Sequence, residues 1–174
     1  MPPWRNAHPI LESGAMKGRN WFYERGEGDA PPRPLTLRAL MTESVATLTP
    51  DQLVGDAIRL IVDRGIRHIP VVDAKDGKLA GLVTETDLLR KVLHGRTLTR
   101  EEQYHAFLDA MLPVEDIMVR DVKTLRPEAN VADAVTLFLR DKIRCVPIVE
   151  VGGRLAGIVT ESDLMKLLEH MMGD

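Results

Sequence analysis

Two short strings in this sequence combine a glycine, a threonine and an aspartate at a spacing that suits ligand binding. The strings are Gly-Leu-Val-Thr-Glu-Thr-Asp at residues 81–87 and Gly-Ile-Val-Thr-Glu-Ser-Asp at residues 157–163. A hydroxyl at a helix N-terminus can bind a phosphate, because the N–H groups and the dipole there favour an anion. A carboxylate about one helical turn further on can accept hydrogen bonds from both hydroxyls of a ribose. The candidate nucleotide-binding residues are therefore Thr84, Asp87, Thr160 and Asp163.

The same residues also have a purely structural interpretation. Threonine or serine with aspartate at this spacing is typical of an ordinary helix N-cap, and for a single copy the cap is the simpler explanation. The string occurs twice, however, and each time at the end of a predicted strand and the start of a predicted helix. This repetition favours a ligand site, and the glycine before the strand end allows a ligand to approach the backbone.

The strings belong to a longer internal repeat that predicts the architecture. Residues 41–73 align with residues 118–150 at a constant shift of 77, and residues 77–88 align with residues 153–164 at a shift of 76. Both copies predict a short extended piece, an amphipathic helix, a buried strand, a tight turn, a second strand and a second helix. We therefore expect an α+β fold of two tandem β-α-β-β-α repeats. Because one copy has too little core alone, the two should pack face to face as a pseudo-two-fold pair.

Element boundaries follow from the apolar patterns. The first helix of each copy is expected to bury one apolar stripe, which ends with Val62 in the first copy and with Leu139 in the second. Pro50 and Pro127 are expected at the first helical turn, where proline is tolerated. The predicted extended pieces and strands cover residues 45–48, 66–72, 79–83, 122–125, 143–149 and 155–159.

Four segments are predicted along the chain. Residues 1–38 form an N-terminal extension, residues 39–94 the first repeat, residues 95–115 a helical connector and residues 116–174 the second repeat. The extension is rich in proline and aromatic residues, so it is expected either to be flexible or to lie over a groove, with the Trp-Phe-Tyr string at 21–23 as its anchor. The connector is expected to pack on the module or on a partner copy through an apolar stripe of Tyr104, Phe107, Leu108 and Met111.

Composition excludes several classes of protein. The net charge of -3 argues against non-specific nucleic-acid binding, which usually needs a basic surface. The single cysteine excludes an internal disulfide, and no apolar run approaches the ~20 residues that span a bilayer. The N-terminus lacks the apolar core of a signal peptide. We therefore expect a cytoplasmic protein.

No pattern in the sequence supports catalysis. The five histidines form no pair at metal-ligand spacing, and Cys145 lies in a predicted buried strand, where an inert core thiol is expected. Glycine patterns of the Walker or Rossmann type are absent from the sequence. The chain is therefore expected not to be an enzyme, and to need neither a metal nor a catalytic cofactor.

The chain resembles the cystathionine β-synthase (CBS) domain family, whose two-repeat unit is called a Bateman module. The resemblance covers about residues 38–170 and depends on the two Gly-x-x-Thr-x-x-Asp strings, on Ile-Arg-His-Ile-Pro-Val-Val-Asp at 66–73, on Ile-Arg-Cys-Val-Pro-Ile-Val-Glu at 143–150, and on Asp-Ile-Met at 116–118. Leu-Met at 40–41 matches the last of these. The resemblance implies a stand-alone regulatory sensor that binds AMP, ADP, ATP or S-adenosylmethionine between the repeats, and modules that pair face to face into a homodimer.

The resemblance also assigns roles to residues. The threonine and aspartate of each string would contact phosphate and ribose. Adenine would lie in an apolar slot from the opposite copy, made of Val45, Ala46 and Ile66 for one site and of Val122, Lys123 and Ile143 for the other. The residues expected near the phosphates are Arg67, His68 and Arg144.

The two sites are expected to differ in affinity. His68 in the first copy is replaced by Cys145 in the second, which removes one potential cation, whereas Ala46 is replaced by Lys123, which adds one. The order of the affinities stays open. His68 also has a structural interpretation, as a half-buried strand histidine bonded to backbone.

Two other functions remain open from the sequence. One is a scaffold that dimerises or docks onto an enzyme or transporter while its clefts stay empty. The other is a module for a different ligand, such as S-adenosylmethionine or a nucleic-acid segment.

Overall fold

The computed structural model describes residues 23–24, 33–92 and 111–172. The chain divides into two compact units, Met1–Leu35 and Thr36–Asp174. In the first unit, β1 (Tyr23–Glu24) pairs antiparallel with β2 (Arg33–Pro34). The second unit contains both repeats. The first two residues of the proposed anchor at 21–23, and most of the predicted connector helix, lie outside the described residues.

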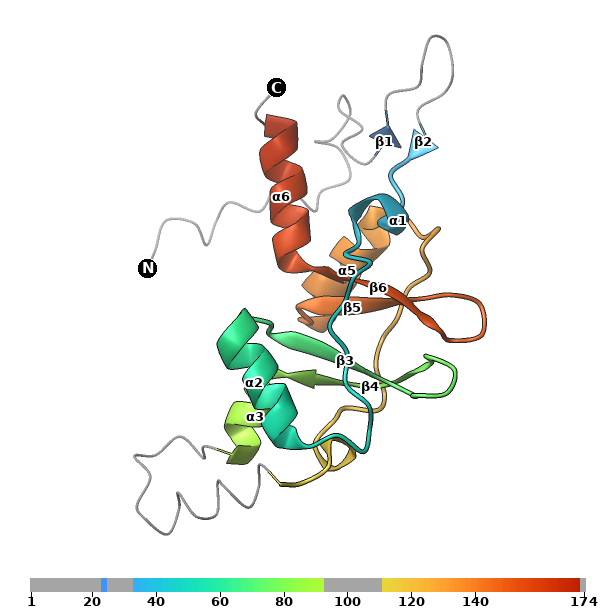
Figure 1. The fold of residues 1–174 in the computed structure, drawn as a ribbon. Coiled ribbons are helices and arrows are strands. Elements are labelled where there is room, and N and C mark those ends of the chain that lie inside the picture. The colour runs from blue at the N-terminus through green and yellow to red at the C-terminus, as the bar shows by residue number, and fades with distance from the viewer. Residues whose placement is uncertain (1–22, 25–32, 93–110, 173–174) are drawn as a thin grey trace, which may run out of the picture. The chain divides into compact units, whose positions relative to one another are not determined.

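The two repeats have the same order of elements (Figure 1). The second unit begins with α1 (Leu37–Leu40), and the short helix η3 (Val114–Asp116) precedes the second repeat. The first repeat contains α2 (Val54–Arg64), β3 (His68–Val72), β4 (Leu79–Thr84) and α3 (Glu85–Val92). The second contains α5 (Val131–Asp141), β5 (Cys145–Val149), β6 (Leu155–Thr160) and α6 (Glu161–Met172). The predicted α+β fold of two repeats is confirmed.

Each repeat is built on an antiparallel hairpin whose central residues are buried on both faces. β3 pairs with β4, and β5 pairs with β6, in the same register with respect to the repeat. The hairpin turns are tight because Gly77 and Gly153 adopt positive φ angles of 69° and 89°, which residues with a side chain rarely adopt. In the first repeat the buried residues of the strands pack against the buried stripe of the first helix.

The first predicted strand of each repeat is reduced to a single residue pair. Leu48 forms a parallel bridge with Val71, and Leu125 forms one with Ile148. The chain then turns before the helix, as shown by the bond from the Gln52 N–H to the Thr49 carbonyl at 3.2 Å.

The prediction that Pro50 and Pro127 occupy the first helical turn is wrong. The helices begin at Val54 and Val131, four residues later. The prolines lie in the preceding turn. The helix starts are instead capped at Leu53 and Asn130, whose N–H groups donate to the carboxylates of Asp56 and Asp133.

The prediction that Val62 and Leu139 belong to the buried stripes is also wrong. These side chains are 74% and 65% exposed, respectively. The residues fully buried on the same helices include Val54, Ala57 and Val131. Val62 lies eight residues beyond Val54, so at about 100° per residue it is rotated by about 80° from Val54, at the edge of the stripe, where the fold leaves it exposed.

The segments that lead into the repeats cross over to the opposite repeat. The Thr42 N–H donates to the Ile158 carbonyl at 2.9 Å, and the Ile158 N–H donates back at 3.0 Å. Leu82 and Val119 exchange the matching pair of bonds, both at 2.9 Å. Met118 is accordingly buried in the core of the first repeat. Each folded half is therefore completed by residues that belong to the other repeat in sequence.

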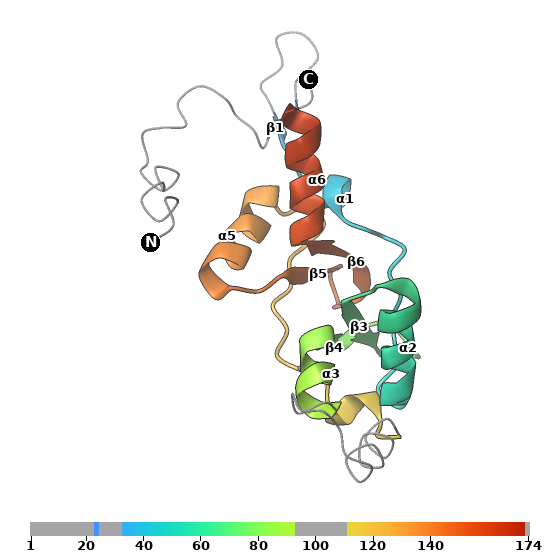
Figure 2. The same cartoon turned by 90° about the vertical axis from the view of Figure 1, so that its left-hand side faces the viewer.

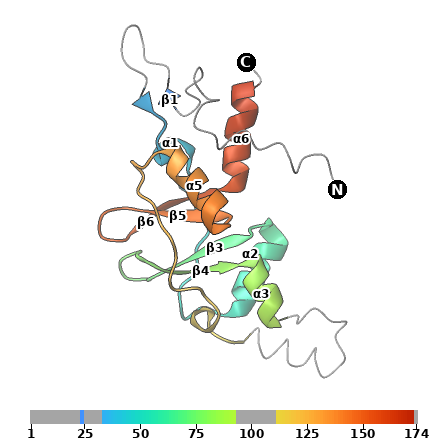
Figure 3. The same cartoon turned by 180° about the vertical axis from the view of Figure 1, so that it is seen from behind.

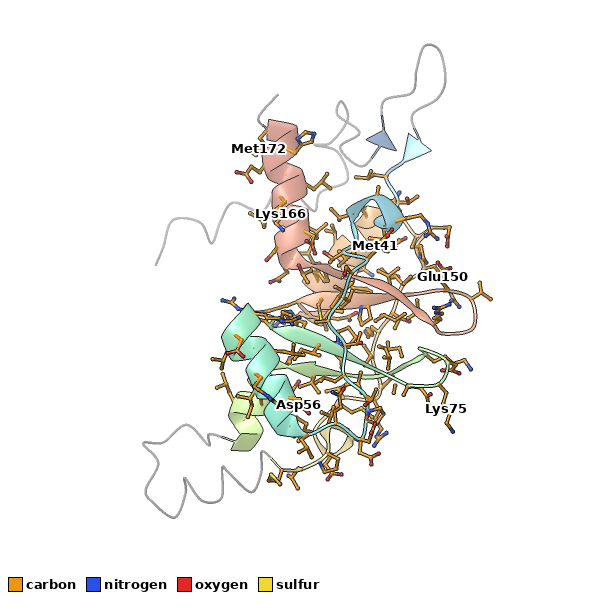
Figure 4. All side chains as sticks on the ribbon, in the orientation of Figure 1. Met41, Asp56, Lys75, Glu150, Lys166 and Met172 are labelled. Atoms are coloured by element: carbon orange, nitrogen blue, oxygen red, sulfur yellow. The ribbon has the colours of Figure 1, made fainter. Side chains whose placement is uncertain are left out.

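The hairpins of the two repeats also lie side by side (Figures 1 and 3). The Leu79 N–H donates to the Gly153 carbonyl at 3.0 Å, and the Leu155 N–H donates to the Gly77 carbonyl at 3.1 Å. Lys75 and Glu150, labelled in Figure 4, lie on these two hairpins. The reciprocal bonds relate the repeats by the predicted pseudo-two-fold axis.

A small apolar cluster fills the space between the repeats. It consists of Leu82, Cys145 and Ile158, with Val45 and Val122 packed against it. Both repeats therefore contribute to one shared core. In the described part of the chain, the helices are too short or too polar to traverse a lipid bilayer.

We predict that Gly81→Ala destabilises the fold, because a Cβ at this position would lie 2.7 Å from Met118 Sδ and 2.8 Å from the Val119 carbonyl oxygen. The backbone oxygen cannot move without breaking the hydrogen bond that it accepts from the Leu82 N–H, so we expect a loss of about 1–3 kcal/mol in the free energy of unfolding. Urea unfolding followed by circular dichroism measures it. Lys75→Ala, at an exposed turn, is the control and should change stability by less than about 0.5 kcal/mol. A Gly81→Ala protein as stable as the wild type would contradict the crossed packing.

Candidate functional site

The first candidate corner lies where β4 ends and α3 begins. Asp87 Oδ2 accepts a hydrogen bond from the Thr84 hydroxyl at 2.6 Å and one from the Thr84 N–H at 3.3 Å. The Asp87 N–H donates back to Thr84 Oγ1 at 3.2 Å. This reciprocal pattern is a capping box, and both side chains are half-buried. The predicted pair is thus brought together, in the geometry of a helix cap.

The second corner has nearly the same geometry. Asp163 Oδ2 accepts from the Thr160 hydroxyl at 2.7 Å and from the Thr160 N–H at 2.8 Å. The other oxygen, Oδ1, lies 3.9 Å from Lys166 Nζ, and the Asp163 side chain is 13% exposed. The carboxylate is thus largely shielded from solvent.

Capping is not peculiar to these two helices. Asp56 Oδ2 accepts from the Leu53 N–H at 3.1 Å at the start of α2, and Asp133 Oδ2 accepts from the Asn130 N–H at 3.0 Å at the start of α5. All four helices of the repeats therefore have an aspartate at the third helical position (Asp56 is labelled in Figure 4). The structural interpretation of the aspartates, as caps, is confirmed.

Capping and ligand binding are compatible at these corners. An ionised carboxylate has about four acceptor positions, and the bonds to threonine occupy two positions on Oδ2 of Asp87 and of Asp163. The positions on Oδ1 can accept the hydroxyls of a sugar. The corners at α3 and α6 differ from the other helix starts because a strand leads directly into the helix, with threonine as the junction residue.

The N–H groups at the two corners are partly engaged. The Glu85 N–H donates to the Arg67 carbonyl at 2.9 Å, and the Glu161 N–H donates to the Arg144 carbonyl at 3.1 Å. The expectation of free N–H groups at these helix ends is therefore only partly met. A phosphate would depend more on the threonine hydroxyl, which can rotate away from the carboxylate.

His68 and Cys145 occupy matching places at the starts of β3 and β5. His68 is in register with Thr84, and Cys145 is in register with Thr160. Burial of the half-exposed His68 ring lowers its pKa from the usual 6.5. Smaller electrostatic effects on this pKa come from charges in both repeats, Glu161, Arg144, Arg67 and Glu85 in decreasing order. His68 thus faces charges at both candidate corners.

Cys145 is chemically quiet. It is 5% exposed and packs in the cluster between the repeats, and burial raises the pKa of its thiol to about 12. The thiolate, which is the reactive form, is therefore scarce at neutral pH. The prediction of an inert core thiol is confirmed.

The structure divides the residues of the expected adenine slots. Val45 and Val122 meet on the cluster between the repeats, whereas Ile66 packs against the core of the first repeat. Ala46 and Ile143 are half-buried. A purine beside either valine would therefore lie next to the interface of the repeats.

Two of the expected cations already have anionic partners. Lys123 Nζ lies 2.6 Å from Asp141 Oδ2, and Arg67 Nε lies 3.6 Å from Glu85 Oε2. Asp141 is not among the site residues predicted from the sequence. Two differences between the copies indicate the pair: Asp141 aligns with Arg64 of the first copy, and Lys123 aligns with Ala46. The second copy therefore has both a lysine and an aspartate where the first copy has neither.

Comparison with known proteins agrees with the fold. The model of the CBS domain family matches residues 37–94 and 114–170. The protein MJ1225 of Methanocaldococcus jannaschii is 28% identical over 135 residues, which make up 76% of this chain and 48% of that protein. Inosine-5'-monophosphate dehydrogenase of the same organism is 30% identical over 127 residues, or 73% of this chain and 22% of that enzyme. The chain thus spans half or less of these two curated relatives.

A similar solved structure contains a bound nucleotide. The crystal structure of CBSX2 in complex with AMP superposes with a TM-score of 0.66 at 27% identity, and the match covers 79% of this chain and 98% of that chain. The two repeated strings and the two hairpins lie within the part of the chain that the family model matches. This chain belongs to the CBS domain family.

Proposed function

We propose that this chain is a regulatory module that binds an adenine nucleotide and does not catalyse a reaction. The observation that carries the proposal is the duplicated corner, where a threonine and a shielded aspartate meet at a strand-to-helix junction and the aspartate keeps one oxygen free of threonine bonds. The similarity to CBSX2, whose structure contains AMP, supports an adenine nucleotide as the ligand.

At each corner the threonine hydroxyl would bind phosphate and Oδ1 of the aspartate would bind ribose. The adenine ring would lie against Val45, Ala46 and Ile66 for the Asp163 site, and against Val122, Lys123 and Ile143 for the Asp87 site. The two sites would differ, because Lys123 is held by Asp141 and Arg67 by Glu85. Arg144 and His68 are the remaining expected contacts of the phosphates.

A purely regulatory role is supported by the side chains at the corners. The thiol nearest to the corners is buried and has a pKa of about 12. The inosine-5'-monophosphate dehydrogenase described above matches over only 22% of its length, so its catalytic activity is not transferred to this chain. We further propose that the protein acts in the cytoplasm, where adenine nucleotides are available.

A ligand-free scaffold is the second candidate. It is favoured by the self-contained capping bonds at both corners and by the two ion pairs, which satisfy polar groups without any ligand. S-adenosylmethionine remains an alternative ligand for the same corners. Nucleic acid is not expected, because the net charge is -3.

We also propose that the module pairs with a second copy of itself. Four large apolar side chains are exposed at positions that match between the repeats: Val62 (74%) with Leu139 (65%), and Leu89 (47%) with Met165 (64%). The helices α2 and α3, which carry two of them, lie side by side on one flank of the first repeat (Figure 2). A surface that is itself two-fold symmetric suits an isologous dimer, in which the same patch meets its own copy.

We predict that AMP raises the melting temperature of the wild-type protein. Ligand at about 100 times its dissociation constant should stabilise the fold by roughly 2.7 kcal/mol, which corresponds to several degrees for a chain of this size. Differential scanning fluorimetry with AMP, ADP, ATP and S-adenosylmethionine in parallel measures the shift and ranks the ligands. No shift with any of them would favour the scaffold.

The Asp87→Ala, Asp163→Ala double variant is expected to lose this shift. Because each substitution also removes a helix cap, the matched control is Asp56→Ala, Asp133→Ala, which removes the equivalent caps from α2 and α5. Both double variants should be less stable by about 1–3 kcal/mol, but only the control should still respond to AMP. A response in the first variant would show that the site assignment is wrong.

We predict that AMP binds more tightly as the pH falls from 8 to 6.5. In the free protein, burial lowers the pKa of His68, which favours the neutral ring. A bound phosphate would raise that pKa, so that binding takes up a proton and gains affinity by at most about tenfold per pH unit. Without ligand the sign is opposite, because the unfolded chain binds the proton more readily and the fold loses stability as the pH falls.

Isothermal titration calorimetry at several pH values measures this dependence. His68→Asn should reduce the slope, whereas His170→Asn, at an exposed position on α6, should leave it unchanged. Equal slopes for His68→Asn and the wild type would place the phosphate away from His68.

We predict that the wild type is a dimer and that Val62→Glu, Leu139→Glu is a monomer, since the variant places charges in the proposed interface. Sedimentation velocity measures the mass. The control is Val151→Glu, which puts the same charge on an apolar residue that is 90% exposed at a hairpin turn. It should remain dimeric. A monomeric wild type, or equal dissociation of the control, would contradict the proposed interface.

A further inference from the structure

Residues 36–42, which we call the N-terminal strap, are attached to the second repeat although they precede the first. The Leu37 N–H donates to the Ala129 carbonyl and the Arg38 N–H donates to the Pro127 carbonyl, both at 2.9 Å. The Leu37 side chain is fully buried. These contacts fix the start of the strap on the second repeat.

The other end of the strap is joined to β6. Thr42 exchanges its two backbone bonds with Ile158, which lies two residues before Thr160. A Cβ added to Gly157 would lie 2.8 Å from the Thr42 carbonyl oxygen and 3.0 Å from Met41 Sδ. The strap and the strand are therefore in direct contact, without space for either to move independently.

Charge also holds the strap in place. Arg38 Nη2 lies 2.8 Å from Glu128 Oε1 and 3.2 Å from Glu150 Oε1. Hydrogen bonds to these carboxylates raise the pKa of Arg38. The hydrogen bond from Arg38 in turn lowers the pKa of Glu128. Arg38 thus joins the strap to the second repeat at two points, Glu128 before the start of α5 and Glu150 after the end of β5.

The segment 113–120 makes the matching contact with the first repeat, but its position in the chain is different. Val119 pairs with Leu82, two residues before Thr84. This segment leads from one repeat into the other. The N-terminal strap instead follows directly on residues 1–35, which form a separate compact unit. The strand of the second corner is therefore bonded to the segment that continues directly from residues 1–35.

We propose that a nucleotide at the Thr160 and Asp163 corner and the docking of the N-terminal strap stabilise each other. The strap is then the element through which this corner acts on the chain that precedes it. The proposal rests on nucleotide binding at the corners. A ligand that orders Thr160 also orders Ile158 on the same strand, and Ile158 holds Thr42. Because coupling between two sites is reciprocal, loosening the strap weakens binding at this corner and leaves the Thr84 and Asp87 corner unchanged.

The first test is hydrogen exchange of the full-length protein with and without AMP, followed by mass spectrometry on the peptide that covers residues 37–42. Asp87→Ala isolates the second corner, and Asp163→Ala isolates the first. We expect AMP to slow exchange of the strap by about fivefold or more in Asp87→Ala and to leave it unchanged in Asp163→Ala.

The second test reverses the direction of the coupling. In the Asp87→Ala background, Arg38→Gln should weaken AMP binding by about two- to fivefold, as expected for the loss of two exposed ion pairs. Arg120→Gln is the control, because the Arg120 ion pair with Glu115 closes within the segment 113–120. It should leave the affinity in this background unchanged.

The outcomes separate this inference from the proposed function. AMP that binds to Asp87→Ala without slowing exchange of the strap would overturn the inference and leave the nucleotide site intact. Equal protection of the strap in Asp163→Ala would also overturn it. Absence of AMP binding to the wild type would overturn the proposed function, and the inference with it.

Discussion

Close backbone contact at two glycines is the constraint on which the paired fold depends. Gly81 and Gly157 leave space for the sulfur atoms of Met118 and Met41 and for the carbonyl oxygens of the residues that follow them. The second strand of each hairpin is therefore paired along one edge with its own repeat. Along the other edge it forms a bridge with a segment that belongs to the other repeat in sequence. Strand edges covered in this way do not offer unpaired backbone groups to other chains.

The same contact determines where the candidate site lies. β4 and β6 are held from both edges and end at Thr84 and Thr160, so the threonines are presented at fixed places. The aspartate one turn into each helix is oriented by its bonds to the threonine. A binding group that is already oriented by the protein loses little conformational freedom when a ligand arrives. The cap would thus prepare the carboxylate for the proposed ribose and would not compete with it.

The duplicated pattern of the sequence was sufficient to predict the two repeats, the hairpins and both corners, because strand and helix periodicity is a local property. It failed at Val62 and Leu139, whose spacing fits the buried stripe but whose side chains lie on an outer flank. Local spacing does not reveal which flank of a helix a second layer will cover. The crossing of residues 36–42 and 113–119 was missed for the same reason, since it pairs residues such as Leu82 and Val119 that are at least 37 positions apart in the sequence.

Ion pairs were the least predictable part of the site. Lys123 and Asp141 lie 18 positions apart in the sequence and meet only because the start of the repeat passes the end of α5. A lysine that the alignment offers to a phosphate can therefore be neutralised by the fold. The hydrogen bonds of Thr84 and Asp87, by contrast, join residues three positions apart, and spacing alone indicated them.

The crossed segments have a consequence for synthesis of the chain on the ribosome. The core of the first repeat includes Val114 and Met118, so the nascent chain cannot close that core when the first repeat has emerged. Closure has to wait for the segment that begins the second repeat, and until then apolar surface of β4 and α2 stays uncovered. Such delayed long-range pairing slows folding and exposes a chain to association with its neighbours. A cut made between the two aligned copies would likewise leave each piece without the residues that complete its core.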